Sequence, residues 1–518
     1  MKRRFVVLFV LVFLGLAASV RAEVSLQEVL HQAREHERQN DWERACAFYA
    51  YALTQDRTQP EIKRKFKTCL RHFHRVRRYQ DASFRDQVLM ISARDALLLY
   101  EEVLKQIRRE YATESAAQFA SLYRNSVDEI RLSLRDPAFR KEFVSTASQA
   151  SIEDVLRRLS DWHARPVKTL ADARRYVFRI ALMLEKQIGL KPTVAILEMT
   201  CGACNSLDEH TYYLTPSDIQ NDRAALQGQM VGIGVELAFS NQGIVISQVF
   251  TGSPAAQAGL FQGDLLLAID GQPVAKNAHL NDVAQQLLGK VGSMVRLDVE
   301  SRGQKRSVSL VRVPVHTSVA EVRMIDMNAG IGYIHLIGFH QNTLAELNTA
   351  IENLADQGMK ALVLDLRGNA GGLFQSAVQV AERFLPEGSF IVDTQGKHSQ
   401  TRYVSQNPAP LTVPLVVLVD GSTSSAAEVL AAALKENRRA TLVGQPTYGK
   451  GTVQHLIEWK TVQAGGIRIT WARLLSPLQN DFNGIGISPD VAVPRGGDFD
   501  EQLLEAQNLA REQVLMPR

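Results

Sequence analysis

Two nearly unbroken apolar segments, residues 361–366 and residues 414–419, constrain the fold of this chain most strongly. Continuous apolar runs of this length are typical of strands buried on both faces, as in a parallel sheet covered by helices. Strand patterns alternate with helical patterns over residues 320–495, which predicts an α/β core. In such a core, functional sites form where strands end in turns.

The turns after these strands carry the residues suited to catalysis. The first ends in Gly371-Gly372, and the second places Ser425 at the start of a predicted helix. A third, glycine-flanked turn contains Lys450, and no histidine occurs over residues 399–454. Because a serine without a histidine partner can be activated by a lysine, Ser425 is a candidate nucleophile and Lys450 its candidate base.

Hydrolysis of an amide also requires donors that bind the developing oxyanion. The N–H of Ala426 belongs to the first turn of the predicted helix, where backbone donors lack a partner within the helix. Gly371 or Gly372 can supply a second donor, because glycine lets the backbone approach a substrate closely. The amide of Gln454 is placed to orient the lysine or its lone pair.

Lys450 must be uncharged to act as a base. With an ordinary pKa of ~10.4, neutrality at pH 7 costs about 4–5 kcal/mol, which burial can supply by disfavouring the ammonium form. The surrounding sequence favours burial, because it is apolar and no acidic residue occurs over residues 438–455. Taken singly, Ser425 would be a helix N-cap and Lys450 a surface lysine; their occurrence together with the glycines favours a catalytic pair.

Four basic residues near the N-terminus account for the formal net charge of +4: Lys2, Arg3, Arg4 and Arg21. The rest of the chain is near neutral, so no nucleic-acid partner is expected. The basic start, the apolar residues 5–18 and Ala22 are typical of a secretory signal peptide cleaved after residue 22. We therefore expect an exported protein, periplasmic or otherwise extracytoplasmic, with an uncleaved anchor as the alternative.

The chain contains four cysteines: Cys46, Cys69, Cys201 and Cys204. Residues 42–55 and 60–76 predict two helices, and in an antiparallel hairpin Cys46 would lie opposite Cys69, which favours a disulfide in an exported protein. The Cys201-Gly-Ala-Cys204 motif fits a local disulfide or two buried thiols better than a metal site, since only His210 is nearby as a further ligand. No metal or organic cofactor is expected.

The region that includes residues 42–55 resembles one tetratricopeptide-type helical pair. Because a lone repeat cannot bury its own apolar face, we expect this segment to pack on the rest of the protein. Its second helix is strongly basic, and a solvated face is favoured over a binding surface for a partner or anionic lipid.

Residues 229–314 change to short strands and tight turns, and their order resembles a PDZ domain, with a generic small β domain as the alternative. In a PDZ domain the N–H groups of a glycine loop bind the C-terminal carboxylate of a peptide, which adds a strand to the sheet edge. This resemblance implies peptide-binding residues in the loop: Gly232, Ile233, Gly234 and Val235.

The predicted division of the chain is 1–22 signal peptide, 23–85 helical tetratricopeptide-like segment, 86–228 helical part of the protease region, 229–315 PDZ domain, 316–495 α/β protease core and 496–518 C-terminal helix.

The turn motifs resemble those of the C-terminal processing peptidases, also called tail-specific proteases. The family's serine stretch is matched by residues 422–428, its Gly-Lys-Gly-x-Val-Gln motif by residues 449–454 and its oxyanion turn by residues 366–372. Residues 207–214 and 483–490 resemble two further family segments, so the resemblance covers roughly residues 90–495. It departs from the family pattern at Ala427, which replaces a serine, and at Glu436, which replaces an aspartate.

The resemblance implies an exported serine protease with a β-rich PDZ domain inserted in a ClpP/crotonase-like core, acting on proteins or peptides with free C-termini. It implies the following site: Ser425 as nucleophile, Lys450 as base, Gln454 as support for the lysine, and Gly371 with Ala426 as oxyanion donors. Ser424 is a rival nucleophile, but one step along a helix turns a side chain by ~100°, and the spacing to Glu428 favours Ser425.

Three other classes of protein share part of this pattern. A trypsin-like PDZ protease is disfavoured because Ala370 stands where its serine would be. A non-catalytic PDZ scaffold would keep the glycine loop but lose the Ser425–Lys450 pair. An acyl-CoA enzyme of the crotonase type is disfavoured by the export signal and by the PDZ-like region.

Overall fold

The computed structural model describes residues 25–56, 59–226, 231–240, 242–250, 253–276, 278, 280–314, 318–494, 496 and 499–515. The predicted signal peptide, residues 1–22, lies outside the described residues. Within them, every helix is too short or too polar to cross a lipid bilayer.

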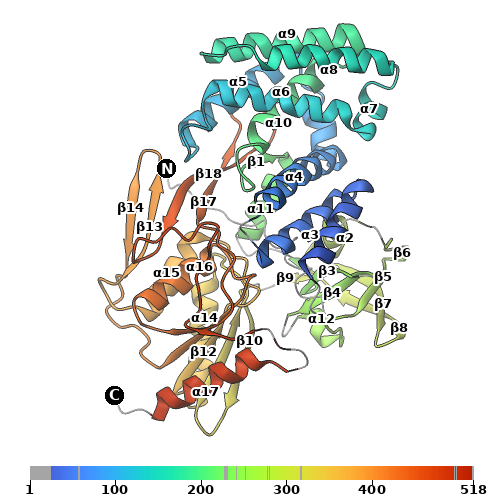
Figure 1. Cartoon of the computed structure of the whole chain (residues 1–518). Helices are drawn as coiled ribbons and strands as arrows, with labels where there is room; N and C mark the ends of the chain where they lie inside the picture. The colour runs from blue at the N-terminus through green and yellow to red at the C-terminus, as the bar shows by residue number, and fades with distance from the viewer. Residues whose placement is uncertain are drawn as a thin grey trace.

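Helices form the whole first part of the described chain, and those of residues 84–205 make a cap over the remainder (Figure 1). The central helix, α10, is buried over almost its full length because most of its residues are apolar or small, and its one acidic residue, Glu198, is paired. It packs against α5, α6 and α9, whose apolar faces form one core with it. The elements of the cap are η1 (Phe84–Val88), α5 (Ala93–Glu110), α6 (Phe119–Arg135), α7 (Pro137–Phe143), α8 (Gln149–His163), α9 (Leu170–Ile188) and α10 (Pro192–Asn205).

Three N-terminal helices precede the cap: α2 (Leu26–Arg38), α3 (Trp42–Gln55) and α4 (Pro60–Gln80). As expected for a lone helical pair, they do not stand alone, since their apolar side chains form one core with those of the PDZ-like region. The predicted Cys46–Cys69 disulfide is wrong: both residues are buried free thiols. Cys201 and Cys204 are also buried free thiols, within α10.

The basic side chains of α4 are paired with acidic residues of the cap. Arg71 binds Glu129, Arg75 binds Asp136 at 2.6 Å, and Arg78 binds Glu198. The predicted solvated basic face is therefore wrong for Arg75 and Arg78, which are buried. These positive charges can be buried because they pair with carboxylates of α6 and α10.

The PDZ-like region is a small antiparallel sheet with strand order β3-β4-β5-β7-β8, in which β3 is an edge strand. The short strands β2 and β9 pair at its base, where the chain leaves and re-enters the surrounding domain. The elements are β2 (Val231–Gly232), β3 (Val235–Ser240), β4 (Gly243–Val249), α12 (Pro254–Gln257), β5 (Leu265–Ile269), β6 (Gln272–Pro273), α13 (Leu280–Leu287), β7 (Met294–Ser301), β8 (Gln304–Val311) and β9 (Val313–Pro314).

The following region is an α/β core built on a sheet of order β10-β11-β12-β15-β16-β19, parallel from β11 onward. Helices α14, α15 and α16 cover one face and α17 covers the other, so β12 and β15 are buried on both sides. This confirms the prediction from the two apolar segments. The elements are β10 (Val319–Asp326), β11 (Ile331–Leu336), α14 (Thr343–Asp356), β12 (Ala361–Asp365), α15 (Phe374–Phe384), β15 (Leu415–Val419), α16 (Ala426–Glu436), β16 (Thr441–Gly444), β19 (Val491–Ala492) and α17 (Glu501–Leu515).

A second sheet joins the helical cap to the core. Its central strand β18 pairs with β1, which follows the cap in sequence, and with β13 and β17, which belong to the core. Ile467 and Ile469 of β18 lie in the same apolar cluster as the cap helices. The elements are β1 (Tyr212–Leu214), α11 (Pro216–Leu226), β13 (Phe390–Gly396), β14 (Gln400–Val404), β17 (Thr452–Glu458) and β18 (Gly466–Leu475).

Candidate active site

The turns that contain Gly371 and Ser425 lie side by side at one edge of the core sheet. They follow β12 and β15, which are neighbouring parallel strands, so their carboxyl ends meet at the same edge. A Cβ atom built on Gly371 would lie 3.0 Å from the Cβ of Ser425 and 3.1 Å from the nitrogen of Ala426. Only glycine therefore allows this close approach, which the φ of 101° at Gly371 also favours.

Ser425 occupies the N-cap position of α16 in an unusual backbone conformation. Its φ of 58° and ψ of −114° are strained for a residue with a side chain, and its exposed fraction is only 2%. Strain of this kind clusters at functional sites, and a sharp turn from strand to helix is one way in which hydrolases present a nucleophilic serine. The neighbouring Ser424 is fully buried, and its hydroxyl has no hydrogen-bond partner among the described residues.

The two predicted oxyanion donors are in different states. The N–H of Ala426 belongs to the first turn of α16, where the helix supplies no acceptor. The N–H of Gly371 donates to Oδ1 of Asn369 at 2.9 Å, so in this conformation it is occupied. Asn369 is itself held by a hydrogen bond from its Nδ2 to the carbonyl of Leu336 at 2.8 Å.

Lys450 is buried, with an exposed fraction of 3%. Burial, and then the positive charge of Arg468, lower the pKa of Lys450 to about 7. Asp208, Glu209 and Glu428 act in the opposite direction, but they do not offset the loss of solvation. Among the described residues, Lys450 forms no ion pair that would offset this effect of burial.

The carboxylate of Glu428 fixes the backbone of both candidate catalytic residues. One oxygen accepts hydrogen bonds from the N–H of Ser425 at 2.8 Å and from the N–H of Lys450 at 2.7 Å. The other accepts from the hydroxyl of Thr447 and the N–H of Gly449. Because Glu428 is fully buried, its four hydrogen bonds couple the turn before α16 to the turn before β17. The sequence reasoning used Glu428 only as an alignment marker.

Gln454 lies on β17 and offers one unused acceptor. Its Nε2 donates to Oγ1 of Thr452 at 2.9 Å and to Oγ1 of Thr470 at 3.2 Å. Its Oε1 is buried and has no hydrogen-bond partner among the described residues. A buried unpaired carbonyl costs about 1–3 kcal/mol, so this oxygen is a ready acceptor for an amine or a water molecule.

The hydroxyl of Ser425 and the amine of Lys450 form no hydrogen bond with each other among the described contacts. The structure thus holds both groups in one buried region but leaves the predicted dyad unformed. Catalytic hydrogen bonds are often long or misaligned without substrate and tighten in the complex.

The helical cap contributes a group of residues beside Lys450 that the sequence reasoning missed. Burial, and then the charge of Lys450, lower the pKa of His210 to about 3, so this imidazole stays neutral. Asp208 accepts hydrogen bonds from the hydroxyl of Tyr111 at 3.0 Å and from the N–H of His210 at 2.8 Å. The only signal in the sequence was the place of Asp208 and His210 in the segment 207–214, which we interpreted as a family segment without a role.

The predicted peptide-binding loop precedes the edge strand β3. Gly234 has a φ of 79°, and a Cβ atom there would lie 2.2 Å from the Cβ of Ser253. The carbonyl groups of Ile233 and Gly234 accept hydrogen bonds from Ala255 and Phe250, which fix the loop from behind. The backbone of the loop therefore depends on glycine at position 234, and its binding of a carboxylate stays a prediction.

No group of three potential metal-ligating side chains (His, Cys, Asp or Glu) is found among the described residues. His210, the nearby ligand considered for the Cys201–Cys204 pair, lies beside Lys450 instead.

Comparison with known proteins identifies two families along the chain. Residues 330–493 match peptidase family S41, and residues 245–301 match the PDZ domain. The PDZ match begins after the glycine loop, so Gly232 and Gly234 lie outside it.

Curated relatives are similar to more than half of this chain. The carboxyl-terminal-processing protease of Synechocystis sp. is 35% identical over 296 residues, which are 56% of this chain and 68% of the relative. Carboxyl-terminal-processing peptidase 2, chloroplastic, of Arabidopsis thaliana is 32% identical over 332 residues, which are 61% of this chain and 62% of the relative. A solved photosystem II D1 C-terminal processing protease is 26% identical with a TM-score of 0.45, covering 78% of this chain and 94% of that one. The chain belongs to peptidase family S41, among the carboxyl-terminal-processing proteases.

Proposed function

We propose that this protein is an exported serine endopeptidase that binds protein C-terminal tails through its PDZ domain and cleaves peptide bonds with a Ser425–Lys450 dyad. The observation that carries this proposal is the buried Lys450, whose pKa of about 7 supplies an uncharged amine near neutral pH. The shared hydrogen bonds of Glu428 support the pairing, because one carboxylate positions the backbone of both residues.

The reaction begins when the neutral amine of Lys450 takes the proton of the Ser425 hydroxyl. The serine oxygen bonds to the carbonyl carbon of the substrate, and the electrons of the carbonyl move onto its oxygen. The N–H of Ala426 binds this oxyanion, joined by the N–H of Gly371 once that group leaves Asn369. The ammonium of Lys450 then protonates the departing amine, and the peptide bond breaks to leave an acyl-serine.

Water completes the cycle. Lys450, again uncharged, takes a proton from a water molecule as the water oxygen bonds to the acyl carbon. The ester bond to Ser425 breaks, and the serine oxygen regains a proton from Lys450. The carboxyl-terminal fragment has already left as the amine of the first step, the amino-terminal fragment now leaves with a new carboxyl group, and no cofactor is consumed. Gln454 Oε1 is positioned to accept a hydrogen bond from the amine and so direct its lone pair.

The test compares purified Ser425→Ala and Lys450→Ala with Ser424→Ala as the matched control. Cleavage of a protein that ends in an apolar free C-terminus is followed by mass spectrometry. We expect the first two variants to lose activity by about 10²–10⁴-fold or more, because each lacks a group that takes part in proton transfer, and the Ser424→Ala variant to retain it. Retained activity in Ser425→Ala would exclude the dyad. Absence of activity in the wild type, with peptide binding intact, would favour the non-catalytic scaffold.

A further inference from the structure

The groove in which the PDZ domain would bind a tail lies between the edge strand β3 and the helix α13. Val235, Leu237 and Phe239 share one face of β3 because side chains alternate along a strand. They belong to one apolar cluster with Leu280, Val283 and Leu287 of α13. A carboxylate held by the loop before Val235 directs the upstream residues of the tail along β3 toward Phe239, which marks the outer end of the groove.

At this outer end, helix α3 contacts both walls of the groove. The guanidinium carbon of Arg44 lies 4.7 Å from the centroid of the Phe239 ring, and Arg44 also donates a hydrogen bond to the carbonyl of Lys276 before α13. The next residue inward, Glu43, accepts a hydrogen bond from the N–H of Leu280 at 3.3 Å. Two consecutive residues of α3 therefore join β3 to the first residue of α13.

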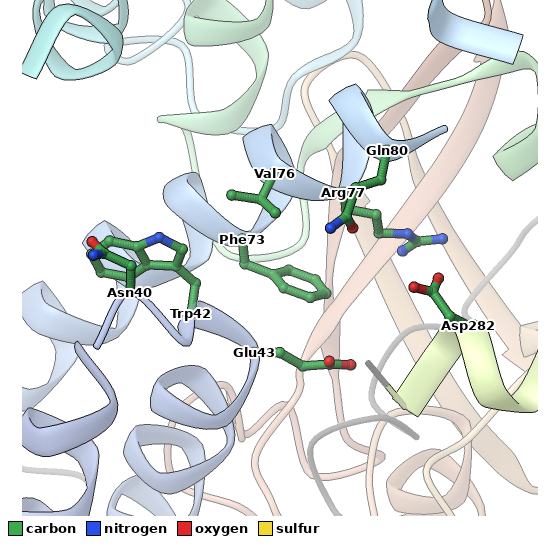
Figure 2. A pocket seen from close by; sticks show the side chains of 8 residues that line it. All are labelled: Asn40, Trp42, Glu43, Phe73, Val76, Arg77, Gln80 and Asp282. Atoms are coloured by element: carbon green, nitrogen blue, oxygen red, sulfur yellow. The ribbon is translucent and has the colours of Figure 1, made fainter. Parts of the chain in front are cut away.

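The contact is closely packed. Glu43 has an exposed fraction of 2%, and the side chains of Trp42, Glu43, Phe73 and Asp282 line a cleft between α3, α4 and α13 (Figure 2). The volume of this cleft is about 30 Å³. Such a volume holds about two water molecules, so little space is left between these three helices. Figure 1 shows α2 and α3 lying against the PDZ domain at β3.

Arg44 is held in place from its own helix as well. Asp41, the N-cap residue of α3, accepts a hydrogen bond from the N–H of Arg44 at 3.3 Å and pairs with its guanidinium at 3.5 Å. The position of the side chain over Phe239 is therefore built into the start of α3.

We propose that α3 is an internal cover that limits the PDZ groove to the last few residues of a tail, so that a longer chain binds only when Arg44 and α3 move away. A strand advances ~3.3 Å per residue, so residues 235–239 match about five residues of an added strand before it meets Arg44. The inference rests on the proposed function, because it assumes that tails bind in this groove. It makes α3 an autoinhibitory element, since every long substrate must first displace it.

The test measures binding of two fluorescent peptides with the same apolar C-terminus, four and ten residues long, by fluorescence anisotropy. All proteins carry Ser425→Ala so that no peptide is cleaved. Arg44→Ala removes the contacts with Phe239 and Lys276, whereas the control Arg38→Ala removes an exposed arginine of α2 that pairs with Glu35 of the same helix. Glu43→Gln provides a second variant that keeps the shape of the buried side chain, in case Arg44→Ala alters folding as judged by circular dichroism.

We expect Arg44→Ala to tighten binding of the ten-residue peptide about tenfold and to leave the four-residue peptide unchanged. The Arg38→Ala control should change neither. Equal affinities of all variants, or weaker binding of the long peptide to Arg44→Ala, would overturn the cover and leave the tail-binding function intact. If no protein binds either peptide, or if amidation of the C-terminus has no effect, the PDZ function itself is wrong and the inference falls with it.

Discussion

Arg78 of helix α4 and Lys450 of the site each have an exposed fraction of 3%, yet they bury positive charge in different ways. Arg78 binds Glu198, whose carboxylate also accepts hydrogen bonds from Tyr79 and Ser133. The pKa of Arg78 is raised, and the guanidinium stays charged. Lys450 forms no ion pair among the described residues, and burial lowers its pKa to about 7.

The difference shows what determines whether a buried cation is structural or chemical. A carboxylate in contact offsets the lost solvation and keeps the charge, as in the α4–cap interface. Without that partner the same burial favours the neutral form, and an amine becomes a base. Arginine suits the first role because it does not lose its proton in proteins, and lysine suits the second.

The largest effect that tests this comparison is expected for Lys450→Arg. Arginine keeps the positive charge and the hydrogen-bonding capacity but cannot accept a proton, so we expect kcat to fall by about 10²–10⁴-fold. Initial rates on a peptide substrate at pH 7 to 9 measure this loss. Activity that returns at high pH would contradict the proposed role, because no accessible pH makes arginine neutral.

The second-largest effect is expected when Arg78 loses its carboxylate partner. Glu198→Ala leaves Arg78 buried without its carboxylate, which we expect to lower the free energy of unfolding by about 3–5 kcal/mol. Urea denaturation followed by circular dichroism measures the change. As the control, Glu35→Ala removes the partner of the exposed Arg38 and should lower the free energy of unfolding far less. Similar losses for the two variants would remove the distinction between the buried and exposed pairs.

The smallest effect concerns the pH profile. In the proposed mechanism the neutral form of Lys450 is the active one, so kcat/KM should rise with pH and inflect near pH 7, the pKa of Lys450 in the free enzyme. Asp208 raises the pKa of Lys450, so Asp208→Asn should move this inflection to lower pH by less than about one unit. The matched control is Asp161→Asn, a change at an exposed position of α8. A shift to higher pH would show that Asp208 acts in the opposite sense.

Much of the core was predictable because its signals are local. The apolar segments that became β12 and β15 indicated strands covered on both faces, and the glycine and serine turns after them indicated where a site would form. Other features depend on partners distant in the chain. The basic face of α4 looked solvated until Glu129, Asp136 and Glu198 were placed against it.

The cysteine prediction was wrong for a related reason. The helix hairpin was correct, but equal distance from a turn does not by itself bring two thiols into bonding geometry, and Cys46 and Cys69 are free. The sequence also could not predict the hydrogen bond that the N–H of Gly371 donates. The glycine turn was visible in the sequence, whereas the hydrogen bond from this N–H to Oδ1 of Asn369 depends on the backbone conformation of the turn.

By itself, the amino-acid sequence determined which residues can do chemistry and where strands, turns and helix starts place them, because apolar periodicity and glycine are local properties. Only the tertiary structure decided the lowered pKa of Lys450, the role of Glu428 as a link between two turns and the contact of α3 with the PDZ domain. Solvation, long-range hydrogen bonds and packing depend on residues that meet only when the chain has folded.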